Sequence, residues 1–333
     1  MTKINIGLNG FGRIGKCVLL QLLEMENINI VTINTSLSPD SIGKYINRDS
    51  VHGKRNHLFQ KIGENKVSVL DQVITIVNSR VIGEINWREL GVDYLFETSG
   101  VYLTKEELKL HQVDYVILSS PPKDNLKMFC FGVNHNSYDG EKIISTASCT
   151  TNCIAPILNF AEKKLGGIEE GSFITVHSAT SSQSVVDMSR DKKRTNRSIF
   201  NNIIPHTTGA SKTINKIIPG LGCKIKGTSV RIPVSNVSMI DLNLRFFTKI
   251  NKEGFFKILE EVSDDRIIIV NRENYVSSDF MSCEIPCIVD YNSTLEISDK
   301  SLKIQLWYDN EWSYAAQMIR MCDFMFEYNK NDK

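Results

Sequence analysis

The chain has 333 residues, of which 41% are hydrophobic and 23% are charged. This composition is typical of a globular protein and excludes extensive disorder, and the length is sufficient for two domains with substantial cores. The formal net charge of +1 gives no electrostatic reason to expect a dedicated nucleic-acid or membrane partner.

The apolar runs and the cysteines predict a cytoplasmic protein. No apolar run approaches the roughly 20 residues that cross a bilayer. The N-terminus, MTKINIGLNG, starts a strand pattern and lacks the layout of a signal peptide. Eight cysteines spread over this length do not form the pattern of a disulfide framework. We therefore expect reduced thiols and a cytoplasmic location.

The first half of the chain alternates short β-branched runs with helical stretches. Strands are predicted at 4–10 and 28–34, with an amphipathic helix over Arg13 to Glu24 between them. Three further apolar runs, separated by helix-length segments, lie at 92–98, 113–119 and 141–146. The alternation predicts βαβ units and a doubly wound parallel sheet, with a hairpin around 65–77 at its edge.

The second half has a different pattern. A helix is predicted from Thr151 to Leu165, followed by the strand-like GSFITVHS and a long polar segment over 178–202. Longer alternating runs, GTSVRIPVSNVSMIDLNLRFF and SLKIQLWYD, predict a mainly antiparallel second sheet. An amphipathic stretch over 313–328 predicts a closing helix.

A glycine loop follows the first strand in the sequence GLNGFGRIG. Gly10, Gly12 and Gly15 match the GxGxxG pattern, in which glycines permit a tight turn, close approach of a pyrophosphate, and close packing of helix on sheet. The anion then lies on the free N–H groups at the helix start. The strand–loop–helix context favours dinucleotide binding over a purely structural turn.

The end of the second predicted strand bears on the choice of dinucleotide. In this fold, an Asp or Glu at that point accepts a hydrogen bond from the ribose 2′-hydroxyl of NAD. The sequence INTSLSPD places Thr35 there, and no carboxylate occurs before Asp40. The repulsion that would exclude a 2′-phosphate is therefore missing, although Thr35 can also bind the unmodified ribose of NAD.

The stretch SCTTNCIAP contains two cysteines one helical turn apart, Cys149 and Cys153. A cysteine at a helix N-terminus or beside an imidazole has a lowered thiol pKa and reacts as the thiolate. The spacing favours Cys149 as a nucleophile and Cys153 as a structural thiol; two inert buried thiols are the alternative. A metal half-site, here or at Cys283 and Cys287, lacks partner spacing, so we expect no metal. His177, at the end of a predicted strand, is the candidate base.

These motifs together resemble the phosphorylating glyceraldehyde-3-phosphate dehydrogenase family. The glycine loop, SCTTNCIAP, VRIP, NVSMIDL and WYDNEWSYA carry the resemblance, which runs from residue 4 to about residue 320. It implies a Rossmann-type NAD(P)-binding domain over 1–148, rejoined by a C-terminal helix over 313–333. It also implies an α+β catalytic domain over 149–312 with a mainly antiparallel sheet.

The resemblance implies an oxidoreductase of glycolysis and gluconeogenesis that makes 1,3-bisphosphoglycerate from D-glyceraldehyde 3-phosphate. Cys149 would form the thiohemiacetal and thioester, and His177 would act as its acid–base partner. Thr180 and Arg231 would hold the substrate's C3 phosphate. The residues implied for the attacking phosphate are Ser148, Thr150, Thr208 and Gly209. Arg194, in the basic run RDKKRTNR, would lie near the phosphates; a solvated loop or an RNA-binding patch is the other interpretation of this run.

The resemblance also implies further cofactor contacts and an assembly. The contacts fall at Arg13, Ile14, Arg80, Ser119 and Asn310. The segment 178–202 corresponds to a loop that packs against a neighbouring subunit, which implies a homotetramer.

Three departures from the family pattern bear on function. Thr35 replaces the usual acidic residue, and Ser189, in DMS, resembles the serine of photosynthetic members that accept NADP. Together they favour NADP or dual use. HSAT replaces the common HAYT and is close to the HSAM of erythrose-4-phosphate dehydrogenases, which makes erythrose 4-phosphate the alternative substrate. A catalytically idle relative that binds RNA or acts as a scaffold is the third hypothesis; intact Cys149, His177, Thr180 and Arg231 argue against it.

Overall fold

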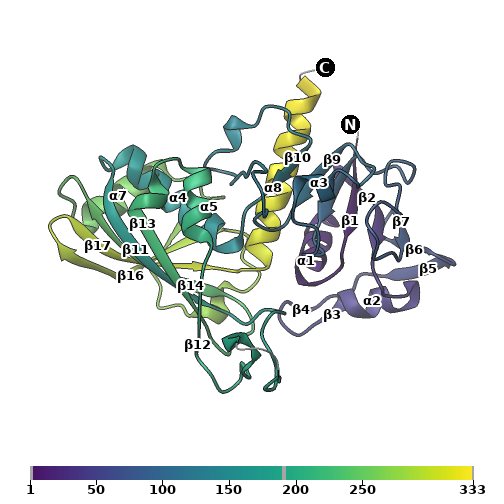
Figure 1. Ribbon diagram of the computed structural model, residues 1–333, viewed down its shortest axis with the longest axis horizontal. Coiled ribbons are helices and arrows are strands. Elements are labelled where there is room, and N and C mark those ends of the chain that lie inside the picture. The colour runs from purple at the N-terminus through teal and green to yellow at the C-terminus, as the bar shows by residue number, and fades with distance from the viewer. Residues whose placement is uncertain (1–2, 190–192, 332–333) are drawn as a thin grey trace. The chain divides into compact units, whose positions relative to one another are not determined.

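A computed structural model of the chain describes residues 3–189 and 193–331 (Figure 1). The chain divides into two compact units. The first comprises residues 1–129, 135–148 and 315–333, and the second comprises residues 130–134 and 149–314. Residues 190–192 of the predicted long loop, and residues 1–2 and 332–333 at the two ends, lie outside the described residues.

The first unit is built on an eight-stranded sheet. Its strands are β1 (Ile4–Asn9), β2 (Ile28–Asn34), β5 (Phe59–Gly63), β6 (Lys66–Val69), β7 (Gln72–Val77), β8 (Tyr94–Glu97), β9 (Tyr115–Leu118) and β10 (Ile143–Ser145). Their order across the sheet is β10-β9-β8-β1-β2-β7-β6-β5. All neighbouring pairs from β10 to β7 are parallel, whereas β7, β6 and β5 pair antiparallel at the edge.

Continuous burial of the central strands explains their composition. All four residues of β8, YLFE, are buried, as are five of the six residues of β1. Strands of a parallel sheet with both faces covered are apolar along their length, because neither face meets water. A two-stranded ribbon, β3 (Arg48–Asp49) with β4 (Gly53–Lys54), lies outside this sheet.

Four helices belong wholly or mainly to the first unit. They are α1 (Arg13–Leu22), α2 (Pro39–Asn47), α3 (Lys105–Leu108) and α8 (Trp312–Asn331). A capping box at Thr104 and Glu107 starts α3. Although α8 ends the described chain, its Phe326 ring contacts Tyr94, and its Asn329 is hydrogen-bonded to the hydroxyls of Tyr94 and Tyr138. These contacts tie the last helix to β8 and to the segment that precedes β10.

The second unit is built on a seven-stranded sheet. Its strands are β11 (Ile168–His177), β12 (Ile204–His206), β13 (Ile225–Arg231), β14 (Ser238–Phe246), β15 (Ile268–Asn271), β16 (Cys287–Ser298) and β17 (Ser301–Tyr308). The order is β12-β13-β11-β14-β17-β16-β15. Only β11 with β13 and β15 with β16 are parallel; the other pairs are antiparallel.

The register of β11 and β13 positions two charged or titratable side chains. Because the strands run parallel, their carboxyl ends meet, and His177 pairs directly with Arg231. The carboxyl ends of parallel strands are a common location for binding sites.

The helices of the second unit are α4 (Cys149–Lys164), α5 (Ala210–Ile217), α6 (Leu221–Lys224) and α7 (Lys252–Val262). Most residues of α4 are buried, and they share one apolar cluster with β14, β16 and β17. Pro156 lies inside α4, where it removes one backbone donor. Three short 3-10 turns are η1 (His135–Ser137), η2 (Arg194–Asn196) and η3 (Ser277–Phe280).

The predicted fold class is confirmed, with a mostly parallel sheet in one unit and a mostly antiparallel sheet in the other. The helix-length segment between the apolar runs at 92–98 and 113–119 forms a shorter helix than expected, because α3 ends at Leu108. Helices α2, α5, α6 and α7 were not predicted from the sequence. None of the helices in the described ranges combines the length and apolar character that crossing a bilayer requires.

Candidate functional site

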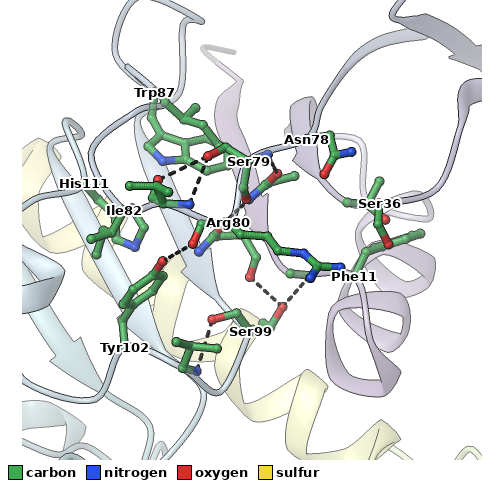
Figure 2. A pocket seen from close by; sticks show the side chains of 18 of the residues that line it. Phe11, Ser36, Asn78, Ser79, Arg80, Ile82, Trp87, Ser99, Tyr102 and His111 are labelled. Carbon is green, nitrogen blue, oxygen red and sulfur yellow. Dashed lines mark hydrogen bonds between the residues drawn. The ribbon is translucent and has the colours of Figure 1, made fainter.

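The first unit contains a cavity of about 590 Å³ at the carboxyl ends of its parallel strands (Figure 2). It is lined by the glycine loop after β1, the turn after β2, the segment after β7 and the segment after β8. Because four loops converge at the point where the strand order reverses, the cavity has the position of a dinucleotide site in a doubly wound sheet.

The glycine loop fits a bound pyrophosphate. Gly10 has φ of +90°, and a Cβ there would lie 2.6 Å from the backbone of Ser99, so only glycine is tolerated. A Cβ on Gly15 would collide with the carbonyl oxygen of Gly10, and a Cβ on Gly12 would meet nothing within 4 Å. The loop therefore has no room for a side chain at Gly10 or Gly15. Gly12, just before α1, has open space beside it in which a pyrophosphate could lie.

The two basic residues of this unit predicted to bind cofactor differ in placement. Arg13 forms a two-pronged ion pair with the carboxylate of Asp49, which also binds the buried Lys16 at 2.6 Å. These partners hold the pKa of Asp49 well below its usual range, against the desolvation that opposes ionisation. Arg80, by contrast, lines the cavity and extends toward the side where Ser36 and Phe11 lie (Figure 2).

Thr35 also lines the cavity, next to the exposed Ser36. Its hydroxyl accepts a hydrogen bond from the Leu37 N–H at 3.1 Å, and its own N–H donates to Val77. The position predicted to read the ribose thus carries hydroxyls and no carboxylate. Ile14 and Ser119 are not among the residues that line the cavity in the described part of the chain.

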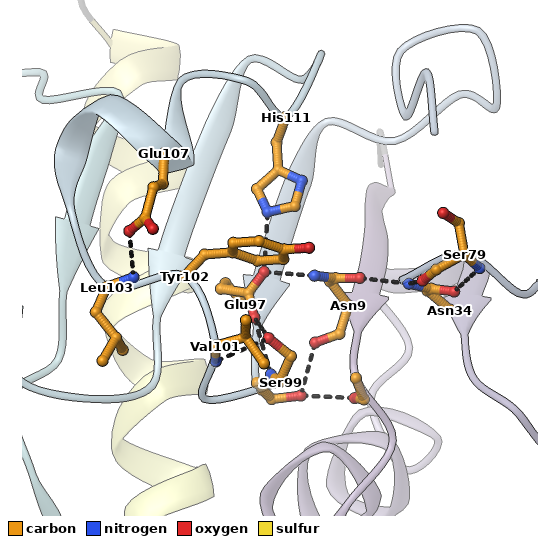
Figure 3. Close-up of polar contacts among 12 residues, drawn as sticks. Asn9, Asn34, Ser79, Glu97, Ser99, Val101, Tyr102, Leu103, Glu107 and His111 are labelled. Atoms are coloured by element: carbon orange, nitrogen blue, oxygen red, sulfur yellow. Dashed lines mark hydrogen bonds and ion pairs between the residues drawn. The ribbon is translucent and has the colours of Figure 1, made fainter. Parts of the chain in front are cut away.

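A buried carboxylate under the cavity was missed by the sequence analysis (Figure 3). Glu97, with no exposed surface, accepts hydrogen bonds from the Asn9 amide and from the N–H and hydroxyl of Ser99. His111 Nε2 lies 2.9 Å from Oε2, the oxygen that also accepts from Asn9, whereas both Ser99 groups donate to Oε1. Asn34 links the network to β2, since its amide donates to Asn9 Oδ1 at 2.7 Å. The network holds three strand ends in place, and its sequence signal is a polar residue at the end of each strand.

The second unit contains the thiol–imidazole pair. Cys149 is the first residue of α4, and its Sγ lies 3.5 Å from Nε2 of His177, the last residue of β11. Two residues before Cys149, Ala147 has φ of 60°, a strained conformation that is common near functional sites. The distance fits a nucleophile and its acid–base partner.

Arg231 controls the protonation of this histidine. Its guanidinium donates to Nδ1 of His177 and, at 3.1 Å, to the carbonyl of Ser178. Since Arg is always a donor, Nδ1 is the bare nitrogen in this arrangement and Nε2 carries the proton that faces Cys149. The Nε atom of Arg231 is buried without a hydrogen-bond partner among the described residues, so it can still serve a ligand.

Burial keeps both members of the pair neutral. Desolvation raises the pKa of the Cys149 thiol, although Arg231 and Thr150 oppose that rise. Desolvation, aided by the charge of Arg231, lowers the pKa of His177 to about 3. The expectation that the helix N-terminus lowers the pKa of Cys149 is therefore wrong for this state, because burial outweighs the helix.

Two buried polar chains hold the surrounding residues. The Tyr308 hydroxyl bridges Thr150 and Thr175 at 3.0 Å each, which fixes the start of α4 against β11 and β17.

The second chain ends at Asn310. The hydroxyls of Ser178 and Ser238 both donate to Oδ1 of Asn310 at 2.8 Å. The amide NH₂ of Asn310 therefore points away from these hydroxyls and is oriented to donate elsewhere.

Other predicted phosphate ligands make local contacts instead. Thr180 is bonded to Ser182 and Gln183, and the Thr208 hydroxyl accepts from the N–H of Ala210 at the start of α5, after Gly209. Arg194 and Ser189 are exposed on either side of residues 190–192. Ser148 directly precedes α4. The structure thus joins Cys149, His177 and Arg231 in one cluster, and leaves the remaining anion ligands as predictions.

Comparison with known proteins gives the same family over both units. Residues 4–105 match the glyceraldehyde 3-phosphate dehydrogenase NAD binding domain, and residues 148–310 match the glyceraldehyde 3-phosphate dehydrogenase C-terminal domain. The cytosolic glyceraldehyde-3-phosphate dehydrogenase of Gracilaria gracilis is 36% identical over 328 residues, which cover 96% of this chain and 97% of the relative. The glyceraldehyde-3-phosphate dehydrogenase of Buchnera aphidicola is 34% identical over 332 residues, with 97% and 98% covered. That of Bacteroides fragilis is 36% identical over 335 residues, with 96% and 98% covered.

Proposed function

The chain belongs to the glyceraldehyde-3-phosphate dehydrogenase family, and from this premise we propose that it oxidises D-glyceraldehyde 3-phosphate to 1,3-bisphosphoglycerate. The reaction is reversible and serves glycolysis or gluconeogenesis. The observation that carries the proposal is the placement of Cys149 Sγ, at the start of a helix and 3.5 Å from His177 Nε2.

Cys149 and His177 divide the chemistry between them. The sulfur of Cys149 adds to the aldehyde carbon, and the resulting hydroxyl loses its proton to His177 Nε2 as the thioester forms. A nicotinamide cofactor, when bound, supplies the hydride acceptor. An oxygen of inorganic phosphate then attacks the thioester carbon, and the Cys149 sulfur leaves, stabilised by the protonated imidazole.

Arg231 couples substrate binding to which ring nitrogen of His177 carries the proton. While the guanidinium donates to Nδ1, His177 Nε2 holds a proton and cannot take another from the thiol. A substrate phosphate that attracts Arg231 would release Nδ1, which lies 2.9 Å from the carbonyl of Ser178 and can donate to it as N–H. The Nε2 atom then becomes the acceptor that the mechanism needs. The unpartnered Nε of Arg231 supports this phosphate site.

The reaction is tested by initial rates of nicotinamide reduction with glyceraldehyde 3-phosphate, with and without inorganic phosphate. Phosphate-dependent turnover that is lost by at least 10³-fold in Cys149→Ala supports the proposal. Erythrose 4-phosphate is the control substrate: faster oxidation of the tetrose, without a phosphate requirement, would replace the proposed substrate. No turnover with either sugar would favour the idle relative.

For the cofactor, we propose that NAD binds in the first unit and that NADP is also accepted. Thr35 and Ser36 offer hydroxyls where a carboxylate would repel a 2′-phosphate, and Arg80 extends toward the same side of the cavity. Ser189 was predicted to contribute as well, and its side chain is exposed.

Selectivity is tested with Thr35→Asp. The new carboxylate should lower kcat/KM for NADP by about 100-fold, the order expected of a close like charge in a binding site, and leave NAD turnover nearly unchanged. Thr35→Ser, which keeps the hydroxyl, is the matched control. A wild-type enzyme with no measurable NADP turnover would contradict the proposed dual use.

For assembly and location, a homotetramer in the cytoplasm is proposed. Four apolar side chains on and just after the long polar segment are more than 60% exposed: Val185, Val186, Phe200 and Ile203. Exposed apolar groups clustered along one segment are typical of a subunit contact. The location is supported by the names of two relatives, from Gracilaria gracilis and Arabidopsis thaliana, which are both called cytosolic.

A further inference from the structure

Three buried polar side chains meet at one edge of the second sheet. Ser178 directly follows β11, Ser238 begins β14, and Asn310 lies two residues after the end of β17. These strands are neighbours, and β14 runs antiparallel to both others, so the end of β11, the start of β14 and the end of β17 fall at the same edge. The exposed fractions of the three residues are 0%, 1% and 5%.

The two serine hydroxyls hold the Asn310 side chain by its oxygen. Ser178 and Ser238 each donate to Oδ1 at 2.8 Å, and an amide oxygen has two lone pairs, so both are used. Ser238 Oγ also accepts from the N–H of Ser178 at 3.1 Å. If the amide were turned over, its NH₂ group would face both hydroxyls, and neither hydroxyl proton would have its acceptor. The contacts therefore fix which end of the amide faces outward.

The outward end of the Asn310 amide consists of donors only. Its two N–H groups have no hydrogen-bond partner in the part of the chain that the structure describes. A ligand that meets them must present an acceptor, such as a carbonyl oxygen. Among the reactants of the proposed reaction, nicotinamide carries an amide, and its carbonyl oxygen is such an acceptor. Its own NH₂ group, a donor, would find no acceptor on Asn310.

We propose that Ser178 and Ser238 are positioning residues that lock the Asn310 amide with its donors toward the carbonyl oxygen of a bound nicotinamide. The inference deepens the proposed function and rests on its nicotinamide cofactor. Neither serine touches the reacting atoms in this assignment, and both act through Asn310. The lock fixes the orientation of the carboxamide and, with it, the orientation of the ring that accepts the hydride.

Ser178 also contacts the acid–base residue. Its carbonyl accepts from Arg231 at 3.1 Å and lies 2.9 Å from Nδ1 of His177, whereas its hydroxyl serves Asn310. Removal of the hydroxyl leaves this carbonyl in place, so one substitution separates the two contacts. The common family pattern HAYT has alanine at this position, and we therefore expect Ser178→Ala to fold.

The test compares the dissociation constants of NAD and ADP-ribose, measured by calorimetry on the full-length protein without sugar or phosphate. ADP-ribose contains every part of NAD except nicotinamide. Ser178→Ala should raise the dissociation constant of NAD about 3- to 10-fold, the range that corresponds to one hydrogen bond, and leave that of ADP-ribose unchanged. The alkylation rate of Cys149 should match the wild type, because the carbonyl beside His177 remains.

A double-mutant cycle determines whether Ser178 acts through Asn310. Asn310→Ala removes the amide, so the addition of Ser178→Ala to this variant should raise the dissociation constant of NAD no further. A merely structural role of the Ser178 hydroxyl would persist in the Asn310→Ala background. Ser238→Ala should weaken NAD binding at least as much as Ser178→Ala, because it removes both a donor to Asn310 and the acceptor of the Ser178 N–H.

Thr294→Val is the matched control. It removes an equally buried hydroxyl of the second unit, which donates to the carbonyl of Asp290 at 2.6 Å, and both affinities should stay unchanged. Three results would overturn the proposal: wild-type NAD affinity in Ser178→Ala, an equal loss for NAD and ADP-ribose, or a full further loss in the Asn310→Ala background. Turnover is recorded separately. A wild type that binds NAD without oxidising the sugar refutes the dehydrogenase function, whereas the binding ratios still decide the role of Ser178.

Discussion

At the scale of single residues, Cys149 and His177 face each other as a thiol and a neutral imidazole. The same burial raises the pKa of one and lowers that of the other. The proposed nucleophile is therefore the neutral thiol, the less reactive form. In the proposed mechanism, a substrate phosphate that draws Arg231 away from His177 changes this balance.

The raised thiol pKa predicts how alkylation of Cys149 depends on pH. Because the thiolate is the reacting form, the rate with iodoacetamide should rise about tenfold per pH unit through neutrality and into the alkaline range. The rate is measured by mass spectrometry of the Cys149 peptide, with Cys149→Ser as the blank. A rate that is already constant below pH 7 would show a preformed thiolate–imidazolium pair.

The lowered pKa of His177 predicts a loss of stability in acid. The folded state takes up this proton near pH 3, whereas the unfolded state takes it up near pH 6.5. As pH falls from 6.5 toward 3, the unfolded state binds a proton that the folded state does not, so the free energy of unfolding falls by up to about 1.4 kcal/mol per pH unit.

His177→Asn should lack this acid-dependent loss of the free energy of unfolding. Urea unfolding at pH 6.5 and pH 4.5 would compare the two proteins, and the wild type should lose about 2 to 3 kcal/mol more than the variant between these values. Equal losses in both proteins would place the pKa of His177 near its ordinary value.

At the scale of elements, the start of α8 depends on one buried carboxylate. Asp309 Oδ1 accepts hydrogen bonds from the N–H groups of Glu311 and Trp312, and Oδ2 accepts from the N–H of Ser282 at 2.7 Å. These donors have no intrahelical partner, so the side chain caps the helix and joins it to the chain after η3.

Asp309→Ala should therefore destabilise the protein by about 2 kcal/mol, the upper end for a lost helix cap, because three backbone donors lose their acceptor. Asp309→Asn, which keeps one oxygen, should lose less. Thermal unfolding measures both. Asp299→Ala, at an exposed ion pair with Lys249, is the control and should leave the melting temperature nearly unchanged. A similar melting temperature for Asp309→Ala would refute the capping role.

Regular elements were predicted from the sequence where the hydrophobic period is long. In the predicted helices α1, α4 and α8, apolar residues recur at the helical period over two or more turns. In the predicted strands β1, β2, β11 and β14, the apolar pattern extends over several pairs of residues. Helix α7 was missed although Asn251 supplies a cap signal, which its side chain fulfils by accepting from the N–H of Gly254. The remaining missed helices are short, and their apolar positions are too few to set a period.

The chemistry was predicted less completely than the elements. The cysteine motif predicted Cys149, and a strand end and the family resemblance predicted His177, but the register that pairs His177 with Arg231 depends on how two strands align. The Glu97 network brings together polar residues far apart in the sequence, each unremarkable by itself. The direction of the Cys149 pKa shift also depends on burial, which a local motif does not encode.

At the scale of the whole molecule, the exposed apolar residues near the long loop predict self-association. Phe200 and Ile203 are 66% and 72% exposed and lie three residues apart, and exposed apolar residues that cluster are typical of a subunit contact. Phe200→Glu combined with Ile203→Glu should dissociate the proposed tetramer, because buried unpaired carboxylates oppose assembly.

Sedimentation velocity measures the number of chains per particle. Leu58→Glu, at an equally exposed apolar residue before β5 of the first unit, is the matched control and should sediment as the wild type. A wild-type protein that sediments as a single chain would refute the tetramer, and an unchanged double variant would exclude this segment from the contact.

The division of the chain also sets the order in which the protein can be completed during synthesis. The second unit ends at Tyr314, whereas the first unit, which contains the N-terminus, needs residues 315–333. Domains fold as their residues emerge from the ribosome, so the parallel sheet must wait, with its face for α8 uncovered, until residues 315–333 have been made. The half of the protein that is made first is finished last.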